Sequence, residues 1–178
     1  MLRIKEKMLT LYTKRLIRTG RVVRTSIGFQ QAQNMGILYS ADNPKKHEAA
    51  RHLASQLNKL GKKVAGLCYA TAPIQAANLA FPTITHHDLR LRGTITNPQA
   101  QAFINTPFDY LFQVDLVGCP VLDYLLAKSQ AKCRVGYYDT VRTSLFEMMV
   151  TFNEQPNSNN INDLTTQMVR CTQLLRTQ

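Results

Sequence analysis

The chain has 178 residues and a formal net charge of +11, with 22 Lys and Arg residues against 11 Asp and Glu. This length allows one domain with a full hydrophobic core, or a smaller domain with an appendage. Four cysteines without a CxxC pair argue against zinc and against a disulfide framework. No apolar run approaches the roughly 20 residues of a membrane span, and the charged N-terminus is unlike a secretory signal, so we expect a cytoplasmic protein.

The first 24 residues carry most of the excess charge, because they hold eight Lys and Arg residues and one acid, Glu6. On a helical projection, five cations fall on one narrow stripe, namely Arg3, Lys7, Lys14, Arg18 and Arg21. Apolar side chains share the other side, namely Ile4, Met8, Leu9, Leu11, Tyr12 and Leu16. We therefore predict a projecting basic amphipathic helix with a polar joint over residues 1–30, followed by one domain over residues 31–178.

Clustered positive charge favours nucleic acid, an anionic membrane surface or an acidic protein face as the partner of this helix. The alternative is a helix that packs on the body and leaves its basic side in water. Five cations without an interleaved acid repel one another, and a polyanion relieves that repulsion while it releases counterions.

The body begins with a βαβ pattern. The apolar run 35–40 predicts a buried strand, and Asn43 followed by Pro44 predicts the start of a helix that Gly61 ends. A second buried strand follows over 63–69, and a crossover of this kind is almost always right-handed. The turn between the first strand and its helix, SADNPKK, lacks glycine, so we expect no dinucleotide; no cofactor of any kind is indicated.

The rest of the chain continues the alternation of strands and helices. We expect short helices over 72–79 and 98–104, a short strand and loop over 82–93, and longer helices over 119–131 and 163–175. We expect further strands over 108–116, 133–137 and 145–152, the last at a sheet edge. These elements predict a three-layer, Rossmann-like α/β domain with a mostly parallel sheet of about five strands.

The segment FDYLFQVDL, followed by DYLLAKSQAKCRVGYYD, resembles the end of the N-terminal Rossmann-like half of heptosyltransferase-type glycosyltransferases. The whole body, with its GILYSAD and GKKV runs, more closely resembles a family of short bacterial proteins of unknown function. The first likeness implies that Asp115 and Asp139 lie near the crevice at the carboxyl ends of the strands, where open α/β sheets bind ligands. These two residues are the candidate ligand crevice.

Other chemistry-bearing residues give weaker signals. Adjacent His86 and His87 point apart in most conformations, so we expect no metal there, and Cys68 has no histidine nearby in sequence to activate it. We therefore expect no catalytic residue. The preferred function is a non-catalytic adaptor whose basic helix contacts RNA phosphates, as in a ribosome or another ribonucleoprotein particle. A surface formed by Lys45, Lys46, Lys62 and Lys63 would extend that contact.

Two alternatives remain. In the first, the protein attaches to a membrane surface, with Met8, Leu9, Leu11 and Leu16 entering the interface. In the second, it is a single-lobe enzyme or binding domain of glycosyltransferase ancestry for a small sugar or nucleotide, and a protein partner completes it.

Overall fold

Six parallel strands form one sheet in the order β3-β2-β1-β4-β5-β6. The computed structural model describes residues 2–20, 22–25, 27–70, 80–90, 94–152 and 160–175. The strands are β1 (Asn34–Ser40), β2 (Lys63–Ala70), β3 (Thr83–Thr85), β4 (Tyr110–Gln113), β5 (Cys133–Tyr137) and β6 (Met148–Val150). From β1 the chain adds strands first toward one edge of the sheet and then, starting with β4, toward the other edge. The strand order therefore reverses between β1 and β4, as in doubly wound folds.

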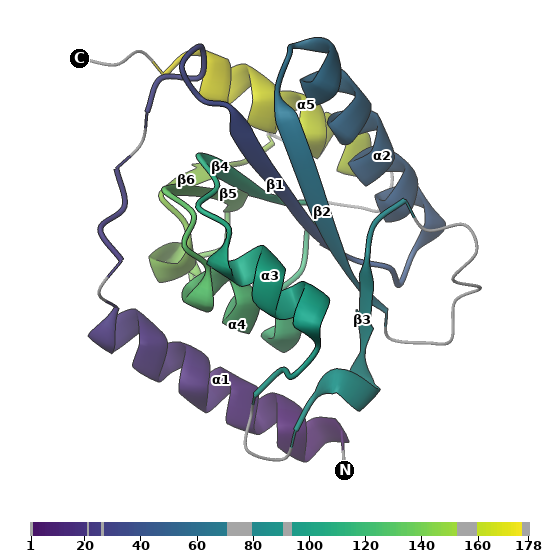
Figure 1. Ribbon diagram of the computed structural model, residues 1–178, viewed down its shortest axis with the longest axis vertical. Helices are drawn as coiled ribbons and strands as arrows, with labels where there is room; N and C mark the ends of the chain where they lie inside the picture. Colours follow the sequence, from purple (N-terminus) through teal and green to yellow (C-terminus); the bar gives the residue numbers. More distant parts are fainter. Residues whose placement is uncertain are drawn as a thin grey trace.

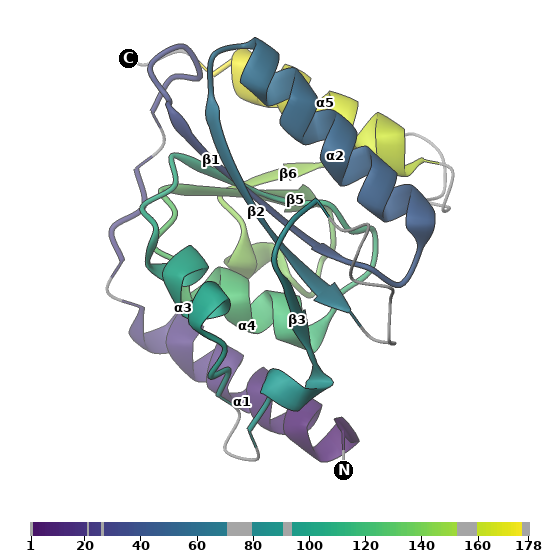
Figure 2. The ribbon, with the colours of Figure 1, turned by 45° about the vertical axis from the view of Figure 1, so that its right-hand side comes forward.

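Helices cover both faces of the sheet (Figures 1 and 2). One face carries α2 (Pro44–Lys59) and α5 (Ile161–Gln173), and the other carries α3 (Pro98–Asn105) and α4 (Pro120–Lys128). Two short 3₁₀ turns, His86–Asp88 and Thr143–Leu145, follow β3 and β5. The N-terminal helix α1 (Leu2–Thr19) packs on α4, so it adds an outer layer on that side.

The local signals of the βαβ unit are confirmed. The Asn43 side chain accepts a hydrogen bond from the backbone N–H of Lys45 at 2.9 Å, and Pro44 occupies the first turn of α2. Gly61 follows the helix at φ 75°, a left-handed conformation that favours glycine. The side chains of β1 from Met35 to Ser40 are all buried, as expected for a strand covered on both faces.

The sheet divides the core into two hydrophobic clusters. The cluster under α2 and α5 includes Ile37, Phe112 and Met168. The cluster under α3 and α4 includes Leu38 and Leu125, and it continues outward to Leu9 of α1, which is fully buried. Because α1 contributes to this second cluster, it is part of the folded body, and the expectation of a projecting helix is wrong.

The predicted fold class is confirmed, with a sheet that is larger and more uniform than expected. All six strands are parallel. At the two edges of the sheet, the three-residue strand β3 pairs in parallel with β2, and β6 pairs in parallel with β5. The 145–152 segment contributes only Met148–Val150 to the sheet, since Leu145 belongs to a 3₁₀ turn. The helix predicted over 72–79 lies outside the described residues.

Gly136 in β5 faces an aromatic ring at a distance that leaves no room for a side chain. A Cβ atom at this position would lie 2.2 Å from Cε1 of Phe146, which is itself buried. We expect Gly136→Ala to lower the free energy of unfolding by about 1–3 kcal/mol through overpacking, as measured by urea denaturation. The double variant with Phe146→Leu should recover part of that loss. Equal stability of Gly136→Ala and the wild type would contradict this packing.

Candidate nucleic-acid interface

The outer face of α1 is a row of exposed cations. Arg3, Lys7, Lys14 and Arg18 are all exposed, and none of them forms an ion pair with any residue that the structure describes. From Arg3 to Arg18 the row extends about 22 Å, at 1.5 Å per residue. The fifth predicted cation, Arg21, lies outside the described residues. The outer face of α1 therefore carries at least four charges without neutralising partners in the described part of the chain.

The inner face of α1 lies opposite this row. It is centred on Leu9 and Thr13, which are 0 % and 5 % exposed, and is flanked by Tyr12, Leu16 and Ile17. Ile4 and Leu11, which the projection assigns to the apolar side, are each 60 % exposed. The helix is rotated so that these four cations stay exposed, because desolvating a charge costs more than exposing an aliphatic side chain.

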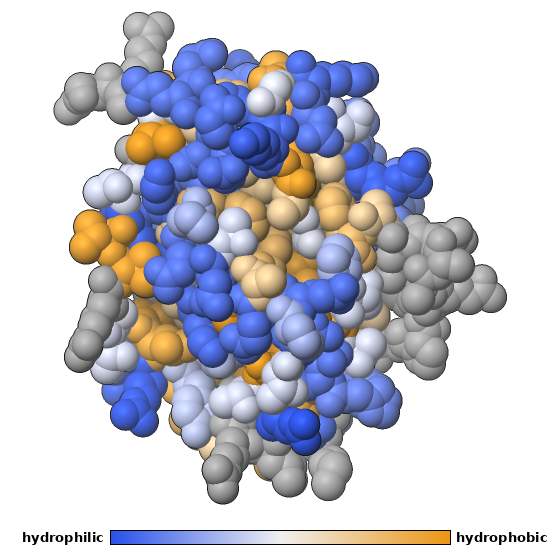
Figure 3. Space-filling view, in the orientation of Figure 1, coloured by the Kyte–Doolittle hydropathy of each residue, from blue (hydrophilic) through white to orange (hydrophobic). Residues whose placement is uncertain are grey.

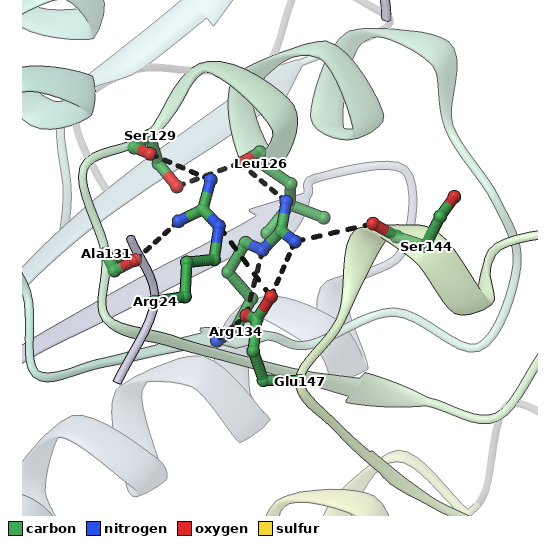
Figure 4. Close-up of polar contacts among 7 residues, drawn as sticks. All are labelled: Arg24, Leu126, Ser129, Ala131, Arg134, Ser144 and Glu147. Carbon is green, nitrogen blue, oxygen red and sulfur yellow. Dashed lines mark hydrogen bonds and ion pairs between the residues drawn. The ribbon is translucent and has the colours of Figure 1, made fainter. Parts of the chain in front are cut away.

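A partly buried cluster of Arg24, Arg134 and Glu147 holds the segment after α1 against the body (Figure 4). Arg24 donates to the backbone oxygens of Ala131 and, at 3.2 Å, Ser129, and its guanidinium lies 3.7 Å from Glu147. Arg134 donates to both carboxylate oxygens of Glu147, at 3.0 and 2.7 Å. Burial and the neighbouring Arg134 lower the pKa of Arg24 to about 10, so Arg24 keeps its charge at neutral pH. These contacts attach the segment 22–25, which follows α1, to the body at the end of α4 and beside β6.

At the start of α1, the Nζ atom of Lys5 donates to the backbone oxygen of His86 at 3.4 Å. Segments far apart in sequence therefore lie beside both ends of the helix, as Figure 1 also shows. Figure 3 shows hydrophilic residues over much of this face of the molecule, with apolar groups at its left edge, where the segment between α1 and β1 runs. Val23 of that segment is 82 % exposed.

The predicted extension of the basic surface by four other lysines is wrong for two of them. Lys62 is buried, and its Nζ donates to the backbone oxygens of Phe29 and Ala32 at 2.8 and 2.7 Å. Lys46 forms ion pairs with Asp42 and Asp115. Lys45 and Lys63 are exposed; Lys45 belongs to α2, across the sheet from α1, whereas Lys63 is the first residue of β2, a strand of the sheet itself.

The second candidate site lies at the carboxyl ends of β1 and β4. Asp115 is 1 % exposed, and it accepts hydrogen bonds from the backbone N–H and the hydroxyl of Ser40 at 2.8 and 2.6 Å. Lys46 also contacts Asp115, and its Nζ lies 2.8 Å from the Ser40 hydroxyl. Burial raises the pKa of Asp115, and Lys46 opposes that effect. Sequence reasoning missed Ser40 and Lys46, although both flank the end of a predicted strand beside that of Asp115.

Asp139 has a different environment. Its carboxylate accepts the backbone N–H of Val141 at 2.9 Å, and its backbone oxygen accepts the N–H of Arg142. No hydrogen bond or ion pair in the described part of the chain joins it to Asp115. The two carboxylates of the predicted crevice therefore act separately, and Asp139 shapes the loop after β5.

Lys46→Met tests the ion pair with Asp115. The substitution leaves a buried carboxylate without its cation, and we expect a loss of about 3–5 kcal/mol in the free energy of unfolding at pH 7. Without Lys46 the folded-state pKa of Asp115 rises further above its unfolded value, so protonation on acidification favours the folded state. The loss should therefore shrink as the pH falls from 7 toward 5 in urea denaturation. A loss that is constant or grows over this range would contradict the assignment.

The structure also describes the surroundings of His86, His87 and Cys68, the residues with weaker signals in the sequence. His86, His87 and Asp88 form one 3₁₀ turn, in which Asp88 accepts the backbone N–H of Thr85 at 2.7 Å. Within the described ranges, no three His, Cys, Asp or Glu side chains gather closely enough to hold a metal ion. Cys68 is fully buried, and burial raises the pKa of its thiol to about 11, so it is protonated at neutral pH.

Comparison with known proteins places this chain in a family. A family model matches residues 5–170, which include most of α1 and nearly all of the body. The chain belongs to a family of unknown function, DUF6913. No curated protein and no solved structure matches it. Among the helices that the structure describes, none has both the length and the apolar character needed to cross a membrane.

Proposed function

We propose that this DUF6913 protein is a non-catalytic adaptor that binds RNA phosphates through the outer face of α1, in a ribosome or another ribonucleoprotein particle. The observation that carries the proposal is the row Arg3, Lys7, Lys14 and Arg18, exposed along one docked helix without ion pairs in the described residues. Phosphate groups would supply the missing counter-charges, and the release of counterions from RNA would drive association.

The docking of α1 supports this proposal. The helix α1 packs on α4 through an inner face centred on the fully buried Leu9, so it is already ordered before it meets a ligand. Binding to such a helix avoids the loss of conformational entropy that folding a disordered arm would require. Contacts of this type hold a nucleic acid in place without reading its sequence, so we expect little sequence preference.

The same docking argues against the membrane alternative. Of the four residues that would enter a membrane interface, Leu9 is fully buried, and Met8 and Leu16 are partly buried against the body. Leu11 and the neighbouring Ile4 remain exposed, which is little apolar area for an interfacial helix. A polyanion that contacts only the cations fits this face better than a bilayer.

A salt titration tests the proposal. Binding of a fluorescent single-stranded RNA is measured by anisotropy between 50 and 300 mM KCl, and vesicles containing anionic lipid serve as the competing surface. For four phosphate contacts on a single strand we expect a slope of about −3 in a plot of log affinity against log salt. Vesicle binding that exceeds RNA binding, or an RNA affinity that does not depend on salt, would overturn the proposal.

A second candidate rests on the likeness to the heptosyltransferase-type lobe. The strand order reverses between β1 and β4, and the cluster of Ser40, Lys46 and Asp115 lies at that point, where open α/β sheets bind ligands. We place this candidate second, because the cluster satisfies its own hydrogen bonds and charges. Stabilisation by a nucleotide sugar in a thermal-shift assay, lost in Asp115→Asn, would support it, and no shift would exclude it.

A further inference from the structure

A pocket of about 390 Å³ lies between α1 and the body. One wall is a side of α1 that includes Ile17 together with Lys14 and Arg18 of the basic row. The start of α4 and the turn after β5 form the other wall, with Asp123, Arg142 and Leu145. This volume is within the range of small-molecule sites, which are mostly apolar with a few polar groups. The proposed RNA contact does not by itself explain such a pocket.

The charges of the pocket favour an anion. Three cations, Lys14, Arg18 and Arg142, line it against the single carboxylate of Asp123. Arg142 is 7 % exposed; its Nε and Nη2 atoms donate to Asp123, and Nη2 also donates to Gln113 at 2.6 Å. Its Nη1 atom makes no hydrogen bond within the described residues. The pocket thus combines an apolar interior, the Nη1 atom of Arg142 with no hydrogen bond among the described residues, and two cations without ion pairs there, Lys14 and Arg18.

We propose that this pocket takes one nucleotide of an RNA strand bound along α1, with the phosphate between Lys14 and Arg18 and the base inside the pocket. This proposal rests on the proposed function and adds the class of RNA. In a duplex the bases are paired and stacked, whereas a single strand presents bases that enter a pocket at little cost. The protein should therefore prefer single-stranded RNA over a duplex.

Thr10→Phe tests the pocket without changing any charge. Thr10 is an exposed residue of α1 that lines the pocket, and its hydroxyl donates only to the backbone oxygen of Glu6. A phenyl group there would occupy the space of the base. The matched control is Thr19→Phe, because Thr19 is exposed on the same helix, makes the equivalent bond to Arg15, and does not line the pocket.

We expect Thr10→Phe to weaken binding of a single-stranded RNA about tenfold, since the displaced base would lose the apolar surface that it buries against Ile17 and Leu145. For Thr10→Phe, the slope of log affinity against log salt and the affinity for an RNA duplex should both stay at the wild-type values, because the phosphate contacts remain. Thr19→Phe should bind both RNAs as the wild type does. Ser144→Phe, which fills the pocket from the opposite wall, should reproduce the loss and so exclude a disturbance of α1 itself.

Unchanged single-strand affinity in both pocket variants would overturn the pocket proposal and leave the proposed function intact. Equal losses for Thr10→Phe and Thr19→Phe would also overturn it. Absence of salt-dependent RNA binding by the wild type would instead overturn the proposed function, and the pocket proposal with it.

Discussion

Neutralising the outer face of α1 with Lys7→Gln, Lys14→Gln and Arg18→Gln together should weaken RNA binding roughly 50-fold at 0.15 M salt. The estimate assumes three lost phosphate contacts on a single strand, each contributing about 0.7 to the slope of log affinity against log salt. The slope should accordingly become shallower by about 2. All three side chains are exposed and have no ion pair within the described part of the chain, so the stability of the fold should be unchanged.

A matched control separates the outer face of α1 from general electrostatics. Lys45, Arg51 and Lys59 are also exposed, and they lie on α2, across the sheet from α1. Their triple substitution by Gln removes the same total charge, and it should change the affinity less than about twofold. Equal losses for the two triple variants would show that the net charge, and not α1, binds the RNA.

Glu147→Gln should destabilise the fold strongly, because it leaves two arginines without their carboxylate. The side chain of Arg134 is 7 % exposed and that of Arg24 is 12 % exposed, and Glu147 is the carboxylate that both contact. The side chain of Glu147 is itself 23 % exposed, so we expect a loss of about 1–3 kcal/mol in the free energy of unfolding, less than for a fully buried ion pair. The midpoint of urea denaturation should fall accordingly, and amide hydrogen exchange of residues 22–25 should accelerate.

The control for this substitution is Glu48→Gln. Glu48 is exposed on α2, and its side chain forms no ion pair among the described residues, so the same chemical change should leave stability within about 0.5 kcal/mol. If Glu147→Gln were as stable as Glu48→Gln, the cluster would not hold the segment 22–25 in place.

Local signals predicted the helices and strands well, because each signal acts within a few residues. Asn43, Pro44 and Gly61 set the ends of α2 by hydrogen bonding and backbone geometry alone. The consecutive apolar residues of β1 predicted a strand covered on both sides. Once the βαβ unit was recognised, the parallel sheet followed from the handedness and order of such units.

Features that depend on residues far apart in the sequence could not be predicted from local sequence patterns. The rotation of α1, which exposes Ile4 and Leu11, depends on the surface of α4, more than 100 residues away. The burial of Lys62 depends on backbone oxygens around Phe29, which no side-chain pattern displays. The contact of Asp115 with Lys46 spans 69 residues, and only the reversal of strand order between β1 and β4 brings the two together.

Lysine footprinting with an amine-reactive reagent tests most directly whether the cations on the outer face of α1 contact RNA. The intact protein is acylated with and without a saturating single-stranded RNA, and mass spectrometry gives the extent of modification at each lysine. We predict that RNA protects Lys7 and Lys14 at least several-fold, while Lys45 and Lys59 of α2, across the sheet from α1, react equally in both samples. Equal modification of all four lysines, or protection of Lys45 and Lys59 alone, would contradict the proposed contact.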